Sequence, residues 1–188
     1  MKKYHLDCFY AVSKFQKHSS IKADLLELIN NSNSTNVIAE SAETNITRAD
    51  WNNCYDDSRP WKTLVYSHLK KHLTQMYYEL GYHDFILREI WFQQYGKNSH
   101  HGWHIHSSNM TNVYYVDLPE GTPKTQLINP FDQSTVIEVD VEEGDTLVFP
   151  SFVLHRAPPN ASDKLKTIIS YNVDFCYPDS QYGKNILK

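Results

Sequence analysis

Apolar residues recur at helical spacing between Pro60 and Gly81. They lie three or four positions apart, and lysines occupy the opposite side of the predicted helix. Because proline suits the first turn of a helix and glycine suits its end, the pattern predicts a helix over residues 60–81 that packs against a sheet. A shorter apolar stripe predicts a helix over residues 21–30, followed by a polar loop at residues 30–36.

Beyond Gly81 the apolar residues recur at every second position, which is the period of a β-strand. Turn-forming residues separate the segments. The segments expected to form strands are residues 84–95, 111–118, 134–141, 145–155 and 164–175. A long helix followed by many short strands predicts a mainly β fold with flanking helices, either a sandwich or a barrel. Residues 37–59 show no clear period and receive no predicted element.

The size and composition fit one folded domain. The 188 residues are 40% hydrophobic and 21% charged, which is enough to bury an ordinary core. We therefore expect a single domain over residues 1–188. Its first portion, residues 1–83, is expected to be helical or irregular and to pack on the sheet, and residues 84–176 are expected to form the β core.

The chain is mildly acidic and has few cysteines. Its 22 acidic residues outnumber its 18 basic ones, and the net charge of −4 disfavours a protein that coats nucleic acid. No apolar run approaches the roughly 20 residues that a membrane helix needs, so no membrane partner is expected. His5 and Asp7 interrupt the segment that would have to be the apolar core of a signal peptide. Cys8, Cys54 and Cys176 form no CxxC pair, and we expect a cytoplasmic protein.

Histidines are concentrated around residue 104. On a strand, His104 and His106 point to the same side, so both imidazoles can reach one metal ion. His155, at the end of an apolar predicted strand, is the candidate third ligand, and three such ligands with open positions suit a non-haem iron(II) centre. The alternative is that these are surface or core histidines with local hydrogen bonds, and the pattern alone leaves both interpretations open. We expect His100 and His101 to be loop residues outside the site.

Two segments of the sequence resemble a known family. They read WFQQYGKNSHHGWHIHSSNMTNVYYVDLPEG and VEEGDTLVFPSFVLHRAPPNASDKLKTIISYN. Their order is an aromatic strand, HxH, a second aromatic strand, a Gly-Asp turn, FPxxxxH and a basic residue before ISYN. In this order they are similar to the 2-oxoglutarate/Fe(II)-dependent oxygenases of the prolyl-hydroxylase-like superfamily, over roughly residues 87–175. We expect Trp91 and Tyr115 of these strands to be core aromatic residues.

The resemblance implies a double-stranded β-helix (a jelly roll, as in cupins) over residues 84–176 that holds Fe(II) between its sheets. His104, His106 and His155 match the metal-ligand positions. The chain departs from the family in having HxH where most members have HxD or HxE. Three neutral imidazoles leave the iron more positively charged than two imidazoles and a carboxylate would. Asp117 is a distant candidate for a missing carboxylate.

The resemblance also implies a site for 2-oxoglutarate. Lys166 corresponds to the basic residue that holds the far carboxylate of this cosubstrate, and Tyr95 lies where members often have a tyrosine that contacts it. On a regular strand Ser170 and Asn172 share a face with Lys166 and are expected to support it. Lysine offers a point charge where most members have the bidentate fork of arginine. Lys164 is the alternative anchor, and the other interpretation of Lys166 is a solvated strand residue without a ligand.

The resemblance therefore implies an Fe(II)/2-oxoglutarate-dependent oxygenase that hydroxylates a substrate with release of succinate and CO2. Its partners would be molecular oxygen and a small-molecule, amino-acid or peptide substrate, and an oligomer is possible. One alternative is a cupin-like dioxygenase with three-histidine iron that does not use 2-oxoglutarate. Another is a non-catalytic jelly-roll binding module, because one scaffold hosts many functions.

Overall fold

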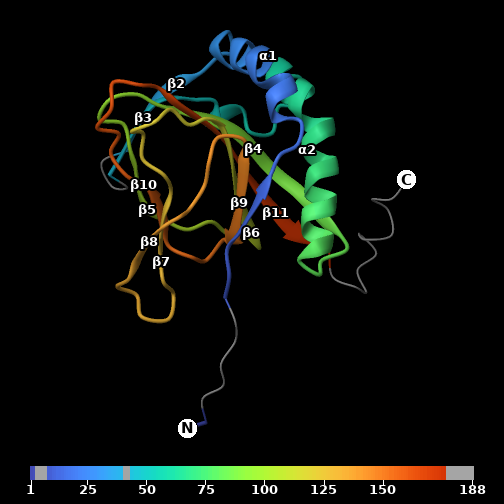
Figure 1. Ribbon diagram of the computed structural model, residues 1–188, viewed down its shortest axis with the longest axis vertical. Helices are drawn as coiled ribbons and strands as arrows, with labels where there is room; N and C mark the ends of the chain where they lie inside the picture. The colour runs from blue at the N-terminus through green and yellow to red at the C-terminus, as the bar shows by residue number, and fades with distance from the viewer. Residues whose placement is uncertain (3–7, 40–42, 177–188) are drawn as a thin grey trace.

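A computed structural model describes residues 1–2, 8–39 and 43–176 of the chain (Figure 1). In these residues the strands form two antiparallel sheets. The larger sheet has the order β1 (Ala11–Lys14), β9 (Asp145–Pro150), β6 (Met110–Asp117), β11 (Lys166–Phe175), β4 (Phe85–Tyr95), β3 (Thr44–Ala49) and β2 (Thr35–Ala39). The smaller sheet has the order β5 (His101–His104), β10 (His155–Ala157), β7 (Gln126–Ile128) and β8 (Val136–Glu138).

A core of apolar side chains lies between the two sheets. Val113 and Leu147 of the larger sheet pack in one buried cluster with Leu127 of the smaller sheet. This cluster joins the sheets into a sandwich, as the alternation of apolar residues predicts. Strands 84–95, 111–118 and 164–175 were predicted close to the bounds of β4, β6 and β11.

Two helices cover the outer face of the larger sheet (Figure 1). The helix α2 (Pro60–Glu79) confirms the prediction for residues 60–81, and Gly81 just beyond it has a positive φ of 88°. The helix α1 (His18–Asn30) begins three residues before the predicted one. Both helices contribute their apolar stripes to a second buried cluster on that outer face.

The chain before α2 contributes strands to the larger sheet, in addition to helix α1. β1 pairs with β9, and β3 pairs with both β2 and β4. A 3-10 helix, η2 (Trp51–Asn53), follows β3. The sequence pattern predicted none of these elements. β2 and η2 are largely exposed, and β3 carries polar side chains, so an apolar period could not mark them.

The predicted strand over residues 145–155 was wrong, because the structure divides it. β9 ends at Pro150, a turn follows, and β10 begins with His155 in the other sheet. The Val153 N–H donates to the Pro150 carbonyl at 2.9 Å and closes the turn. His155 is therefore the first residue of a short strand in the smaller sheet. The sequence pattern had predicted it as the last residue of one longer strand.

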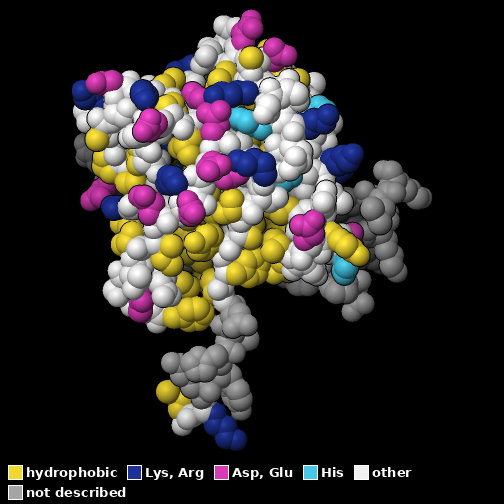
Figure 2. Space-filling view, viewed as in Figure 1, with side chains coloured by type: hydrophobic (Ala, Val, Ile, Leu, Met, Phe, Trp, Pro, Cys, Tyr) yellow, Lys and Arg dark blue, Asp and Glu magenta, His cyan; other side chains and the backbone are white. Residues whose placement is uncertain are grey.

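The described residues contain no membrane-spanning helix, and the face of the molecule in Figure 2 carries no wide basic area. No helix among the described residues is both long and apolar enough to cross a bilayer. Figure 2 shows basic and acidic side chains intermixed over that face, with apolar side chains gathered toward its lower part. This face therefore offers no continuous basic surface for a polyanion.

Candidate metal centre

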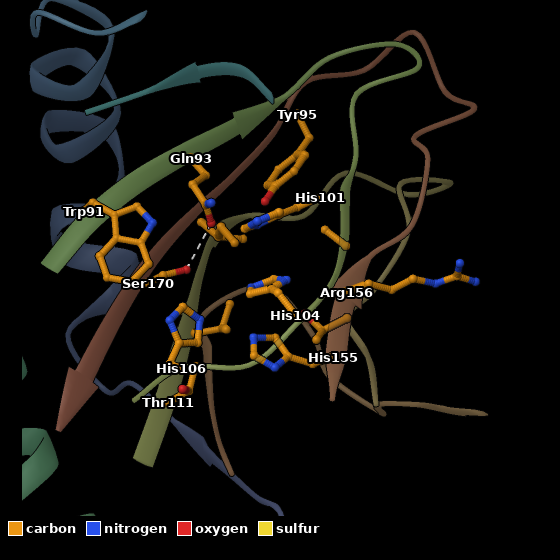
Figure 3. Close-up of a pocket in the computed structure, with 14 residues that line it drawn as sticks. Trp91, Gln93, Tyr95, His101, His104, His106, Thr111, His155, Arg156 and Ser170 are labelled. Atoms are coloured by element: carbon orange, nitrogen blue, oxygen red, sulfur yellow. Dashed lines mark hydrogen bonds between the residues drawn. The ribbon is translucent and has the colours of Figure 1, made fainter. Parts of the chain in front are cut away.

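Three histidines from the smaller sheet and the segment after β5 converge on one point (Figure 3). His104 lies opposite His155 in the antiparallel pair of β5 and β10, so the register places the two side chains side by side. The His106 N–H donates to the Ser151 carbonyl at 3.0 Å, which holds the segment after β5 against the turn before β10. One ligand atom from each histidine lies within 4.8 Å of the other two, so small side-chain movements can bring all three onto one ion.

Backbone carbonyls fix the orientation of two of these rings. His104 Nδ1 lies 2.7 Å from the Gly102 oxygen, and His155 Nδ1 lies 2.9 Å from the Val153 oxygen. Because a carbonyl only accepts, each Nδ1 must carry the proton and donate it. The Nε2 atoms of both rings then keep their lone pairs, which is the arrangement that metal-binding histidines show.

Burial keeps the three imidazoles neutral near pH 7. Desolvation is the largest cause in each case: it lowers the pKa of His104, lowers the pKa of His106 to about 4, and lowers the pKa of His155 well below its usual range. The neighbouring rings also oppose a positive charge on His106 and His155. The cluster therefore presents unprotonated nitrogen donors at physiological pH, as a metal site requires.

His101 was expected in a loop outside the site, and this prediction was wrong. The residue begins β5, is buried, and stacks on His104 with ring centroids 3.8 Å apart and an interplanar angle of 19°. Burial lowers the pKa of His101 to about 3. The ring therefore supports the orientation of His104 as a neutral neighbour. His100 is half-buried and lies in an isolated bridge with Asn45, away from the cluster.

No carboxylate joins the three histidines within the part of the chain that the structure describes. Asp117, the candidate for this role, forms an ion pair with Lys22 at 2.7 Å. The site thus differs from a two-histidine, one-carboxylate centre in the charge of its donors.

Lys166 is a buried basic residue packed against Tyr95, which lines the hollow in front of the three histidines. It is only 1% exposed, lies opposite Tyr95 in the pairing of β11 with β4, and has its Nζ 4.7 Å from the centre of the Tyr95 ring. Its ammonium donates to the Pro123 carbonyl at 2.8 Å, and no described carboxylate pairs with it. Desolvation lowers the pKa of Lys166 to about 7. A buried ammonium with one carbonyl acceptor and no anion is a fitting partner for the carboxylate of a ligand.

The other predicted cosubstrate residues are divided between two places. Tyr95 and Ser170 line the hollow in front of the histidines, and Ser170 donates to Gln93 at 3.1 Å. Asn172 instead donates to Glu89 at 3.0 Å and lines an adjacent hollow. Since a strand rises about 3.3 Å per residue, Ser170 and Asn172 lie roughly 13 and 20 Å along β11 from Lys166 and do not support it directly. The alternative anchor, Lys164, is exposed and donates to the Glu120 carbonyl.

Two residues of β4 belong to the site although the sequence interpretation did not include them. Gln93 and Trp91 line the histidine hollow with Tyr95 (Figure 3). Trp91, which was expected in the core, has a buried indole N–H without a hydrogen-bond partner in the described structure. The alternation of β4 places both on the face of Tyr95, and a glutamine among apolar residues on that face is the signal that could have indicated them. Tyr115, by contrast, is buried and donates to Thr125 at 2.7 Å.

The structure is similar to solved structures of 2-oxoglutarate/Fe(II) oxygenases. SnoN, a non-heme alpha ketoglutarate dependent epimerase from nogalamycin biosynthesis, matches with a TM-score of 0.66 and 10% identity over 95% of this chain and 85% of that chain. A prolyl-4-hydroxylase from Pseudomonas putida matches with a TM-score of 0.58 and 14% identity over 88% of this chain and 92% of that chain. A 2OG-Fe(II) oxygenase family oxidoreductase from Burkholderia pseudomallei matches with a TM-score of 0.63 and 12% identity over 88% of this chain and 85% of that chain. The chain has the fold of these oxygenases.

This similarity confirms the predicted fold class, a mainly β jelly roll with flanking helices. It also confirms, at the level of the fold, the resemblance to 2-oxoglutarate/Fe(II) oxygenases. The sequence matches no family model and no curated protein. Sequence identities of 10 to 14% establish only a shared fold. The identity of the metal, of the cosubstrate and of the reaction must therefore be argued from the side chains of the site.

Proposed function

We propose that the protein is an Fe(II)/2-oxoglutarate-dependent oxygenase, with His104, His106 and His155 as metal ligands. The observation that carries the proposal is the convergence of three neutral imidazoles in a hollow that Tyr95 also lines, with the buried amine of Lys166 packed on the Tyr95 ring and without a described carboxylate partner. The first feature suits a transition-metal ion and the second suits a carboxylate ligand.

The donor set fits Fe(II). Two of the three rings donate Nδ1–H to a backbone carbonyl and so present Nε2, and burial keeps all three unprotonated. Three imidazoles contribute no negative charge, so the ion keeps a larger positive charge than in a site with a carboxylate ligand. A dianionic cosubstrate would offset that charge.

Lys166 would hold the far carboxylate of 2-oxoglutarate, and Tyr95 would form the adjoining wall. Two ammonium hydrogens of Lys166 remain after the bond to the Pro123 carbonyl. A carboxylate there would form a charge-assisted pair in a buried environment and stabilise the charged form of the lysine. Ser170 and Asn172 remain proposed contacts of the cosubstrate or substrate, from the hollows that they line.

When bound, Fe(II) and 2-oxoglutarate supply the oxidising chemistry, with release of succinate and CO2. The chain supplies orientation and exclusion of water. His101 holds the His104 ring by stacking, and the hydrogen bond from Ser170 sets the orientation of the Gln93 amide at the wall of the hollow. Trp91 and Tyr95 cover the hollow with apolar surface.

We propose hydroxylation as the reaction, on a small-molecule, amino-acid or peptide substrate. Similar structures are named for different reactions, including the epimerase SnoN and the carbocyclase SnoK. One similar prolyl hydroxylase was solved with a peptide fragment and SnoN with nogalamycin RO, iron and alpha ketoglutarate. The fold is thus compatible with both kinds of substrate.

The test is anaerobic addition of Fe(II) and then 2-oxoglutarate to the purified protein. We expect a visible charge-transfer band that is lost in His155→Ala and in Lys166→Ala, and retained in His100→Ala as a matched histidine control. Iron binding without a band would refute the use of 2-oxoglutarate and favour a three-histidine dioxygenase, an alternative that the absence of a carboxylate in the described cluster supports. No iron binding would refute the oxygenase and favour a binding module.

A further inference from the structure

A second hollow adjoins the metal site on the side of His106. It has a volume of about 380 Å³, which suits a ligand the size of an amino acid. We propose that this hollow is a substrate subsite for an organic cation, an amine or a guanidinium group, with Glu89 as the residue that selects it. The proposal rests on the oxygenase function, because it names the substrate class of the same centre.

The two hollows share a wall. Trp91 and His106 line both, and their ring centroids are 6.0 Å apart. A molecule in the second hollow would therefore contact the edge of the metal site while the cosubstrate residues Tyr95 and Lys166 remain on the other side, near the far end of β4. This division leaves the second hollow for the substrate.

Glu89 gives this hollow a negative charge that no described basic side chain neutralises. Its carboxylate accepts hydrogen bonds from the Tyr55 hydroxyl at 2.8 Å and from the Asn172 amide at 3.0 Å. Both donors are neutral, so they fix the carboxylate without cancelling its charge. The adjacent basic residue, Arg88, is paired with Asp174 at 2.7 Å.

Aromatic rings stand beside this carboxylate. Trp51 stacks on Trp91 with ring centroids 5.8 Å apart and an interplanar angle of 11°, and it is 37% exposed. A cation above such a face gains electrostatic attraction from the ring. The preceding residue, Asp50, is buried and accepts hydrogen bonds from Arg59 and from the Phe92 N–H, which anchors the start of η2 that carries Trp51.

The buried N–H of Trp91 points to a further polar contact. It is the donor of a side chain only 2% exposed, and it has no acceptor in the described structure. Figure 3 shows the Trp91 ring at one end of the histidine hollow. A substrate that carries an acceptor, such as the carboxylate or carbonyl of an amino acid or peptide, would satisfy this donor. A basic amino acid has both groups.

The experiment measures binding of L-arginine and of L-citrulline, its neutral isostere, to the 188-residue chain in the presence of a chelator. Isothermal titration and tryptophan fluorescence provide two independent readouts. We expect L-arginine to bind at least about tenfold more tightly than L-citrulline, and L-lysine to bind as well, because a charge-assisted contact exceeds a neutral one. Glu89→Gln keeps the shape and should remove the preference, whereas Glu27→Gln, an exposed residue of α1, should keep it. Trp51→Ala should weaken L-arginine binding about threefold.

The proposal is overturned if neither cation binds at millimolar concentration, if L-citrulline binds as well as L-arginine, or if the preference survives in Glu89→Gln. Because no metal or 2-oxoglutarate is present, these results are independent of the charge-transfer band. A band without cation binding overturns the subsite and leaves the oxygenase function standing. Glu89-dependent cation binding without a band supports the cation site and overturns the 2-oxoglutarate-dependent function.

Discussion

Replacing Lys166 with methionine should stabilise the protein near neutral pH and remove its affinity for 2-oxoglutarate. Burial lowers the pKa of Lys166 from 10.5 to about 7. At about 1.4 kcal/mol for each tenfold change in the protonation equilibrium, this depression corresponds to about 5 kcal/mol. That figure is an upper limit, because the surroundings of a buried charge relax and the bond to the Pro123 carbonyl is lost in the variant. We expect a gain of about 2 kcal/mol at pH 7.

The same depression sets the direction of the pH dependence. Between pH 7 and 10.5 the unfolded chain holds a proton on Lys166 that the folded chain has released. Protonation therefore favours the unfolded state in this window, and the contribution of Lys166 to stability rises with pH from 7 to 10.5. Methionine has no proton to bind, so the variant should lack this rise.

The assay is urea denaturation of metal-free protein at pH 7 and pH 9.5, with Lys164→Met as the exposed control from the same segment. The advantage of Lys166→Met should shrink at the higher pH, and the control should match the wild type within about 0.5 kcal/mol. With iron present, 2-oxoglutarate at about 100 times its Kd should raise wild-type stability by about 2.7 kcal/mol and leave Lys166→Met unchanged. A Lys166→Met protein that is less stable than the wild type at pH 7, or that 2-oxoglutarate still stabilises, would refute the reasoning.

Three further results are expected. His155→Ala should reduce Fe(II) affinity at least 100-fold in a competition titration. Its circular dichroism spectrum should be unchanged, because two apolar clusters that do not include the three histidines hold the sheets and helices together. Burial lowers the pKa of His106 from 6.5 to about 4, so as the pH falls the unfolded chain protonates this residue before the folded chain does. Protonation then favours the unfolded state, and urea denaturation should show the metal-free protein losing stability between about pH 6.5 and 4. Gly144→Ala should lower the free energy of unfolding by about 3 kcal/mol, because its φ is +85° and a Cβ would lie 2.8 Å from the His18 ring. Gly121→Ala, with the same φ and open space, should cost only about 1 kcal/mol; equal losses would contradict the steric argument.

The long elements could be predicted because their periodicity is repeated many times. α2 spans 20 residues, and β4 and β11 span 11 and 10, so each shows several turns of the helix or several alternations of the strand. β10 has three residues, too few to show any period. The division between β9 and β10 depends on which sheet each strand joins. Tertiary contacts determine this pairing, and the local sequence pattern does not reveal it.

The site was predictable in its histidines and less so in its surroundings. His104, His106 and His155 were proposed from spacing and resemblance, and the structure brings their ligand atoms together. His101 was missed because its stacking on His104 depends on the local path of β5, which spacing does not reveal. Asn172 was grouped with Lys166 because alternation assigns a face and says nothing of distance along the strand.

The place of β11 in the larger sheet affects how the protein is made. β11 lies between β4 and β6, which are not paired with each other, and it is the last strand that the structure describes. During translation the ribosome releases β4, β6 and all three histidines before the strand that joins them. Until β11 is synthesised, the facing edges of β4 and β6 therefore stay unpaired in the nascent chain. Unpaired strand edges promote aggregation, and chaperones protect them. A nonsense mutation before residue 166 would leave these edges permanently open, so it should produce an aggregating fragment and no shortened form of the protein.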